Sequence, residues 1–166
     1  MVEKTRSELV IVGSDATDQV ESAKQLFLEY ANSLNFSLCF QNFDKELTGL
    51  PREYSSPSGR LVLAFEDGKL AGCVALRKID NDICEMKRLY MRPEFRARGI
   101  GRRLATKIIE EAPEIGYLTM RLDTAPSMKE AISLYRSLGF KEIEQYRSNP
   151  IAGALFMELR LQSKKK

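Results

Sequence analysis

A basic, glycine-bearing turn holds the side chains whose types and spacing could do chemistry most directly. Arg96, Arg98 and Arg102 supply fixed positive charge, and Gly99 and Gly101 stand between them. The turn joins an apolar run to a helical pattern, so free amides at a helix N-terminus and the helix dipole would both favour an anion. Glycines let the backbone approach that anion, and guanidinium groups bind phosphate oxygens strongly. The pattern predicts a phosphate-binding turn.

Two common phosphate-binding motifs do not describe this turn. The Gly-Lys-Ser/Thr of a P-loop is absent, and Leu104 stands where a dinucleotide fingerprint needs its third glycine. The form that fits is Arg-x-x-Gly-x-Gly, carried by Arg96, Gly99 and Gly101.

Glu85 is the second candidate for chemistry, because it lies in the otherwise apolar residues 83–86. Burying a carboxylate is costly unless it is paired, and burial would raise its pKa toward the range of a general base. The alternative is a salt bridge with Lys87 or Arg88 on the sheet surface. Both interpretations stay open at this point.

Other proton carriers and metal ligands are restricted by composition. The chain has no histidine, so proton transfer must use Glu, Asp, Tyr, Lys, Cys or water. Cys39, Cys73 and Cys84 form no C-x-x-C pair, and two of them lie in apolar runs that indicate strands. We expect buried free thiols and no metal site.

The elements that must position these residues follow from hydrophobic spacing and turn signals. Strands are expected at residues 9–13, 61–65, 70–76, 83–91, 117–123, 140–146 and 154–161. Asp67-Gly68 predicts a hairpin between two of them. Helices are expected after residue 18, over residues 100–111 with Pro113 and Gly116 as the end, and from a capping box at Ser127 and Glu130 to Gly139. This order predicts an α/β (α+β) fold, a mixed sheet of about seven strands with helices on both faces.

Length and charge predict a single domain. The 166 residues are 43% apolar, enough for one core, so we expect one domain over residues 1–162 and a solvated basic tail over residues 163–166. A net charge of +3 is too small to indicate a general nucleic-acid binder. Neither a signal peptide nor 18 consecutive apolar residues is present, so we expect a cytoplasmic protein with no membrane partner.

Three segments together resemble a known family. The Arg-x-x-Gly-x-Gly turn, residues 86–93 (Met-Lys-Arg-Leu-Tyr-Met-Arg-Pro) and residues 131–140 (Ala-Ile-Ser-Leu-Tyr-Arg-Ser-Leu-Gly-Phe) closely resemble the GNAT superfamily of acyl-CoA-dependent N-acyltransferases. The matching segments cover about residues 60–160. The resemblance implies a GNAT-type sheet, acetyl-CoA as cosubstrate and direct transfer to an amine without a covalent intermediate.

The resemblance also implies which residues bind the coenzyme. In the family, the backbone at the end of the central strand pairs with the pantetheine arm, which corresponds to Leu89, Tyr90 and Met91 here. Amides of the turn and the helix start hold the pyrophosphate. Together with Arg96 of the motif, those residues are Ala97, Arg98, Gly99, Ile100, Gly101 and Arg102.

Two catalytic roles follow from the same resemblance. Glu85 resembles the glutamate that some members use as a base, and Tyr135, in Leu-Tyr-x-x-Leu-Gly-Phe, resembles the tyrosine that protonates the departing thiolate. The alternative for Tyr135 is a core aromatic on an amphipathic helix. Many members have a coenzyme-contacting asparagine at the start of this helix, whereas this chain has Pro126, Ser127 and Met128.

The acceptor is not identified by the sequence. Family members bind it with segments that correspond to residues 36–54 and 146–153. Asp44, Glu46 and Glu53 in the first segment would either attract a cationic amine or be solvated. The resemblance implies a monomer or homodimer.

Two other functions compete with acetyl transfer. One is a non-catalytic acyl-CoA-binding sensor or interaction domain, against which Glu85 and Tyr135 argue. The other is a nucleic-acid-binding domain that uses Arg92, Arg96, Arg98, Arg102 and Arg103. The latter predicts binding to DNA or RNA that depends strongly on salt.

Overall fold

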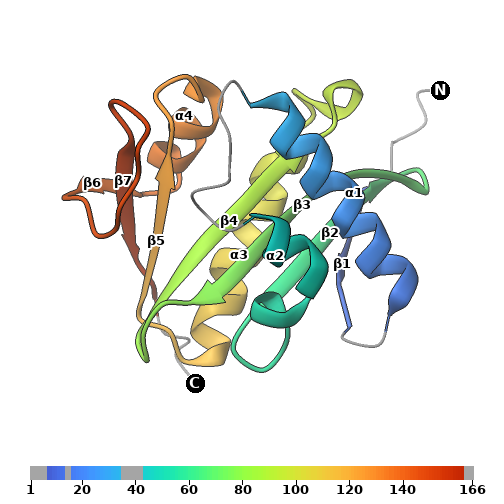
Figure 1. Cartoon of the computed structure of the whole chain (residues 1–166), viewed down its shortest axis with the longest axis horizontal. Coiled ribbons are helices and arrows are strands. Elements are labelled where there is room, and N and C mark those ends of the chain that lie inside the picture. The colour runs from blue at the N-terminus through green and yellow to red at the C-terminus, as the bar shows by residue number, and fades with distance from the viewer. Residues whose placement is uncertain (1–6, 14–15, 35–42, 163–166) are drawn as a thin grey trace.

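The structure, a computed structural model, describes residues 7–13, 16–34 and 43–162. Within these residues, seven strands form one sheet with helices on both faces (Figure 1). The strands are β1 (Ser7–Ile11), β2 (Arg60–Glu66), β3 (Lys69–Lys78), β4 (Ile83–Met91), β5 (Thr119–Thr124), β6 (Lys141–Ile143) and β7 (Leu155–Arg160). The helices are α1 (Thr17–Ser33), α2 (Phe43–Gly49), α3 (Ile100–Ile115) and α4 (Lys129–Ser137), with 3-10 turns η2 (Arg52–Tyr54) and η3 (Pro93–Phe95).

The sheet is mixed, and its topology confirms the predicted fold class. The strand order is β1-β2-β3-β4-β5-β7-β6, and every neighbouring pair is antiparallel except β4 and β5. The chain passes from β4 to β5 through α3, as a parallel connection requires. The hairpin predicted at Asp67-Gly68 is present, because β2 pairs with β3 directly across that turn.

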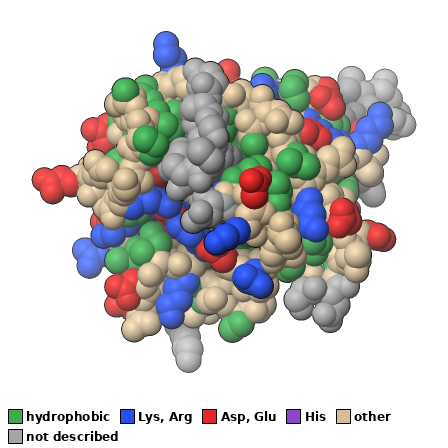
Figure 2. All heavy atoms as spheres, in the orientation of Figure 1, with side chains coloured by type: hydrophobic (Ala, Val, Ile, Leu, Met, Phe, Trp, Pro, Cys, Tyr) green, Lys and Arg blue, Asp and Glu red, His purple; other side chains and the backbone are tan. Residues whose placement is uncertain are grey.

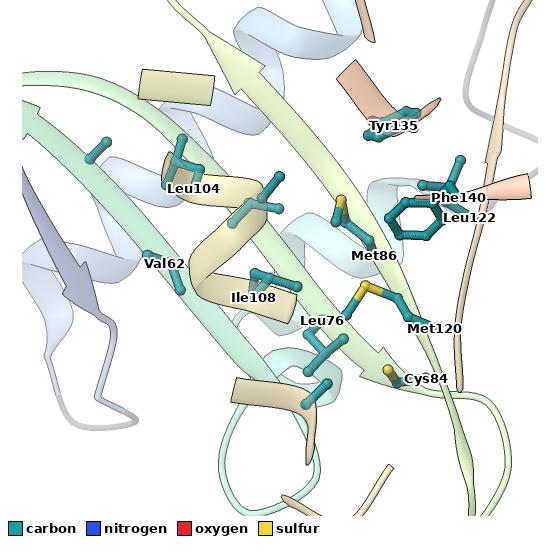
Figure 3. Close-up of a cluster of buried hydrophobic side chains, with 14 of the residues drawn as sticks. Val62, Leu76, Cys84, Met86, Leu104, Ile108, Met120, Leu122, Tyr135 and Phe140 are labelled. Atoms are coloured by element: carbon teal, nitrogen blue, oxygen red, sulfur yellow. The ribbon is translucent and has the colours of Figure 1, made fainter. Parts of the chain in front are cut away.

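Two apolar cores lie on opposite faces of the sheet, because successive strand residues point to opposite sides. Leu61 and Leu63 of β2 pack with the residues of α1 and α2, while Val62 and Ala64 pack with α3 and α4. Figure 3 shows part of the second core, where Leu104 and Ile108 of α3 lie against side chains of the sheet. The three-layer arrangement therefore places α1 and α2 on one face and α3 and α4 on the other.

The two central strands separate along their length. β4 and β5 pair at Ile83, Cys84 and Glu85, opposite Thr119 to Arg121. Beyond that point the strands diverge into a V (Figure 1). Among the described strands, the remainder of β4 pairs with β3 alone, so its other edge is open to a ligand.

A bulge changes the direction of β4 in this open part. The register passes from Ala75↔Lys87 to Cys73↔Tyr90, so Arg88 and Leu89 together face the single residue between Cys73 and Ala75. Arg88 has φ 60°, in the left-handed region that non-glycine residues rarely adopt. Such bulges bend a strand and redirect its side chains.

Three boundaries differ from the prediction. α3 continues through Pro113 to Ile115 and ends at Gly116 (φ 120°), because a proline near the end of a helix removes only one late hydrogen bond. The capping box is wrong: Met128 is the N-cap with no side-chain bond, and its amide bonds to the carbonyl of Ala125, which leaves Ser127 in a turn. The sixth strand is only Lys141–Ile143, because the residues after it leave the sheet to contact β4 and β5.

Gly72 of β3 is required by the close approach of β3 to the end of β4. A Cβ at this position would collide with the carbonyl oxygen of Tyr90 and the sulfur of Met91. We expect Gly72→Ala to lower the free energy of unfolding by about 1–3 kcal/mol, as overpacking typically does. Thermal unfolding measures this, with Gly13→Ala as the control because nothing lies within 4 Å of its added Cβ. Equal melting temperatures for the two variants would contradict the expectation.

Candidate functional site

A cleft of about 650 Å³ opens where β4 ends. The end of β4, the turn after η3, the first turn of α3 and the N-terminal half of α4 form its walls, together with the end of α1. Its lining residues are Tyr30, Ser33, Leu89, Tyr90, Met91, Phe95, Arg96, Ala97, Gly99, Ile100, Gly101, Arg102, Ser127, Met128, Lys129, Glu130, Ala131 and Leu134. Of the ten residues that the sequence predicts for coenzyme binding, nine line the cleft and Arg98 does not.

Arg98 differs from the other predicted coenzyme-binding residues. Its guanidinium donates to Glu66 at 2.6 Å, although nearly half of its side chain is exposed. The resemblance assigns the coenzyme contact of this position mainly to the main chain, and the Arg98 side chain does not line the cleft. No local pattern indicates this pair, because Glu66 lies 32 residues from Arg98 in the chain.

One end of the cleft has the backbone geometry of an anion site. Ala97 (φ 64°) and Gly99 (φ 80°) both adopt left-handed conformations, and Gly99 is the N-cap of α3. No side chain caps this helix start, so its first amides are available to a ligand. Turns of this kind bring successive amides together into a concave anion-binding surface. Arg96 and Arg102 add positive charge on the wall of the cleft.

A small inner pocket of about 40 Å³ adjoins the cleft where β4 and β5 diverge. Tyr30, Leu89 and Met128 line both spaces, so the two are contiguous. The remaining lining residues of the inner pocket are Met86, Lys87, Arg88, Asp123, Thr124 and Tyr135. The inner pocket is therefore where a group carried through the cleft would meet polar side chains.

Tyr135 of α4 lies at the junction of the core and the inner pocket. Its ring packs edge-on against Phe140, with 5.8 Å between centroids, and the side chain is buried. Figure 3 shows it with Phe140 and Leu122 at one end of the core. Burial raises the pKa of its hydroxyl, and the charges of Tyr30 and Asp123 add to the rise. Tyr135 is thus a core aromatic that also lines the inner pocket, so its core packing does not decide against the acid role expected from the resemblance.

Glu85 lies in a dense buried ion network. Its carboxylate accepts hydrogen bonds from Arg77 (2.9 Å), Tyr146 (2.6 Å) and Arg147, and Lys87 Nζ lies 3.9 Å away. Burial alone would raise the pKa of Glu85, but these cations and the Tyr146 hydroxyl outweigh it and lower the pKa. The raised pKa expected from the sequence is therefore wrong. The charges that overturn it come from β3 and from the loop after β6.

The salt-bridge alternative for Glu85 holds only in part. Lys87 lies in its network, but Arg88 does not: its guanidinium makes two hydrogen bonds to Glu46 of α2, at 2.8 and 3.0 Å. The pair is buried rather than on the surface. Burial, followed by the charge of Arg88, lowers the pKa of Lys87 to about 7.

The two segments predicted to bind the acceptor, residues 36–54 and 146–153, contribute side chains to these ion pairs. Residues 36–42 of the first segment lie outside the described residues. Glu46 accepts from Arg88 and from Tyr54, and Glu53 accepts from Arg77. Both acids are therefore paired within the protein rather than simply solvated. Figure 2 shows Lys and Arg side chains, with a few Asp and Glu, toward the middle of the face that carries α1 and α2.

Sequence reasoning missed Tyr30, Asp123 and Arg147 as site residues. Asp123 is the acid near the end of β5, and it accepts from Asn149 Nδ2 at 3.0 Å and contacts Arg147 at 3.4 Å. Residues 147 and 149 fall in the predicted acceptor segment 146–153. Its position near the end of β5, one of the two parallel strands, is a signal that could have indicated Asp123.

Comparison with known proteins identifies the family of the chain. The chain matches the model of the acetyltransferase (GNAT) family over residues 23–140. The chain belongs to the GNAT family. It is 37% identical over 157 residues to an uncharacterized N-acetyltransferase of Schizosaccharomyces pombe, an alignment that covers 93% of this chain and 96% of that protein. This GNAT protein is accordingly an acyltransferase.

Solved structures agree on the GNAT fold. An acetyltransferase of Streptococcus agalactiae matches with a TM-score of 0.75 at 20% identity, over 93% of this chain and 98% of that one. The PaiA N-acetyltransferase of Thermoplasma acidophilum, solved in complex with coenzyme A, matches with a TM-score of 0.71 at 21% identity, over 93% and 99%. At these identities the likeness concerns the fold.

Two negative findings apply to the residues that the structure describes. None of their helices has the length and apolar character needed to cross a bilayer. No group of three or more His, Cys, Asp or Glu side chains among them is arranged to hold a metal ion.

Proposed function

We propose that this GNAT protein is an N-acetyltransferase that binds acetyl-CoA in the cleft and transfers the acetyl group directly to an amine. The observation that carries the proposal is the continuity of three features. The uncapped start of α3, the open edge of β4 and the inner pocket follow one another along a single cleft. The coenzyme A bound to the Thermoplasma relative supports the same ligand class here.

In this proposal the coenzyme is bound mostly by main chain. The pyrophosphate is bound by amides of residues 97–102 with charge from Arg96 and Arg102, and the pantetheine arm pairs with β4 at Leu89 to Met91. This directs the thioester toward the inner pocket. Ser127, Met128 and Lys129 line the position at which many relatives have an asparagine, so they would make its coenzyme contact.

The chemistry requires one proton acceptor and one proton donor. The amine must lose a proton to attack the thioester carbonyl, and the departing thiolate must gain one. Tyr135, in the inner pocket, is the proposed donor. Glu85 is the acceptor expected from the sequence, but both of its oxygens are engaged by cations or by Tyr146, and its pKa is lowered.

Calorimetric titration of the wild-type protein tests coenzyme binding. We expect micromolar binding of acetyl-CoA and CoA, and binding of S-acetylpantetheine that is weaker by at least about 10-fold, since lost charge-assisted hydrogen bonds are each worth more than 1.4 kcal/mol. Equal affinities would contradict a pyrophosphate site at residues 97–102. Absence of any binding would refute the proposed function.

Acetyl-CoA consumption over a panel of amino acids, polyamines and peptides with free N-termini tests turnover. Binding with no consumption would favour a non-catalytic acyl-CoA sensor. The nucleic-acid alternative has less support, because Arg92 and Arg98 are paired with Glu29 and Glu66. A gel shift of DNA or RNA at low salt would support the nucleic-acid-binding alternative.

A further inference from the structure

Three acids lie in the wall of the inner pocket or pair with residues of that wall, and they are neutralised to different degrees. Glu46 receives two hydrogen bonds from the Arg88 guanidinium and one from Tyr54. Glu85 accepts hydrogen bonds from Arg77, Arg147 and Tyr146, and Lys87 Nζ lies 3.9 Å from its carboxylate.

Asp123 is the third acid and the least compensated of the three. Its oxygens meet the neutral amide of Asn149 at 3.0 Å and one nitrogen of Arg147 at 3.4 Å. That same nitrogen of Arg147 also donates to Glu85. A further cation at Asp123 would therefore complete its neutralisation.

Asp123 is also the acid that faces the inner pocket. Of the described residues that line this pocket, it alone carries a carboxyl group, and neither Glu46 nor Glu85 lines it. Two basic residues share the lining: Arg88 is already paired with Glu46, and burial lowers the pKa of Lys87 to about 7. The volume of about 40 Å³ exceeds the roughly 10–15 Å³ that one water needs, so it admits small groups rather than a whole substrate. An ammonium head group and the acetyl group are of this size.

The pocket brings Asp123 together with the proposed proton donor. Asp123 comes from β5 and Tyr135 from α4, and both line the pocket. The charge of Asp123 contributes, after burial, to raising the pKa of both Tyr135 and Tyr30. The three groups therefore lie within electrostatic range of one another.

We propose that Asp123 binds the ammonium group of a primary-amine acceptor and takes its proton, an inference that rests on the proposed acetyl transfer. The Asp123 carboxylate accepts one proton from the ammonium, and the neutral nitrogen attacks the thioester carbonyl carbon. The C–N bond forms, and the C–S bond then breaks as the Tyr135 hydroxyl protonates the thiolate. The second nitrogen proton restores Tyr135, and Asp123 releases its proton to solvent, which leaves amide and free CoA.

Asp123→Asn tests this role, because it keeps the shape of the side chain and removes the charge. On the amine of the panel that wild type acetylates fastest, we expect kcat/KM to fall by at least about 100-fold, the range of a general base. The dissociation constant of CoA should stay within about twofold, since Asp123 does not line the cleft that would hold the coenzyme. Glu158→Gln is the matched control, because it removes a carboxylate of β7 that is paired with Arg121 of β5, and neither residue lines the inner pocket.

Chemical rescue separates catalysis from structural support. Asp123→Ala opens a space in which formate can replace the carboxylate. Formate should therefore raise the rate of this variant by at least about 10-fold, while chloride should not. Near wild-type rates for Asp123→Asn together with inactive Glu85→Gln would overturn the inference and return the base to Glu85. So would inactive Asp123→Ala without rescue. If wild type itself binds no CoA or acetylates no amine, the proposed function fails and the inference falls with it.

Discussion

Tyr135→Phe is expected to lower kcat by about 10- to 1,000-fold while leaving the fold and coenzyme binding intact, the lower end reflecting water as a substitute donor. The ring carries the packing against Phe140, and phenylalanine retains it. What is lost is the hydroxyl in the inner pocket, and with it the proton for the departing thiolate.

The measurement is release of free CoA thiol under saturating acetyl-CoA, beside thermal unfolding of each variant. Tyr117→Phe is the control: Tyr117 is another buried tyrosine, but its hydroxyl donates to the carbonyl of Ser58, away from the cleft. That variant should lose about 1 kcal/mol of stability and no turnover. A wild-type kcat in Tyr135→Phe would assign Tyr135 to the core alone.

The pKa of Tyr135 adds a pH expectation to the same experiment. Burial and nearby negative charge raise this pKa above its ordinary value of 10.0, so the donor stays protonated at all moderately basic pH values. We therefore expect no loss of wild-type kcat from Tyr135 ionisation below pH 10.

The sequence predicted local structure and the coenzyme side of the site well, because both depend on short-range patterns. The apolar runs of β2 and β3, the Asp67-Gly68 turn between them and the helical spacing of α3 are readable within a few residues. The glycine-bearing turn is equally local: the backbone conformations of Ala97 and Gly99 are set within one loop.

The acceptor side could not be predicted in the same way, because long-range charge pairs determine it. The partners of Glu85 are Arg77 on β3 and Tyr146 and Arg147 on the loop after β6, the latter two 61 and 62 residues away in the chain. No short-range pattern in the sequence indicates these partners of Glu85. The sequence could place an acid in the central strand, but the sign of its pKa shift depended on which cations the fold brought to it.

Glu85→Gln is expected to destabilise the protein by about 3 kcal/mol, because removing one partner of a buried ion pair leaves the others uncompensated. Glu85 is fully buried, and Arg77 and Arg147 would lose their shared carboxylate. For a chain of this size the melting temperature should fall by about 6–12 °C. Glu142→Gln is the control, since its pair with Arg136 is more than half exposed and should contribute almost nothing.

The pH dependence of this loss identifies its origin. The pKa of Glu85 lies below its ordinary value of 4.5, so its ionised form stabilises the fold above that pH, and the contribution disappears as pH falls through the folded-state pKa. The difference in stability between wild type and Glu85→Gln should therefore shrink as the pH falls below 4.5. The direction does not depend on Lys87, which loses its proton near pH 7, because Arg77 and Arg147 stay charged.

The same variant tests Glu85 as the base. Its carboxylate is already ionised throughout the neutral range, so we expect Glu85→Gln to leave the shape of the pH-rate profile unchanged when measured at a temperature where the variant is folded. A changed profile together with unchanged stability would instead make Glu85 the base. Since Arg147 contacts both carboxylates, loss of Glu85 frees it to pair fully with Asp123, and the resulting neutralisation should weaken binding of the amine more than binding of the coenzyme. A rise in KM for the amine without a change in the dissociation constant of CoA is the kinetic sign that the ion network sets the charge of the acceptor pocket.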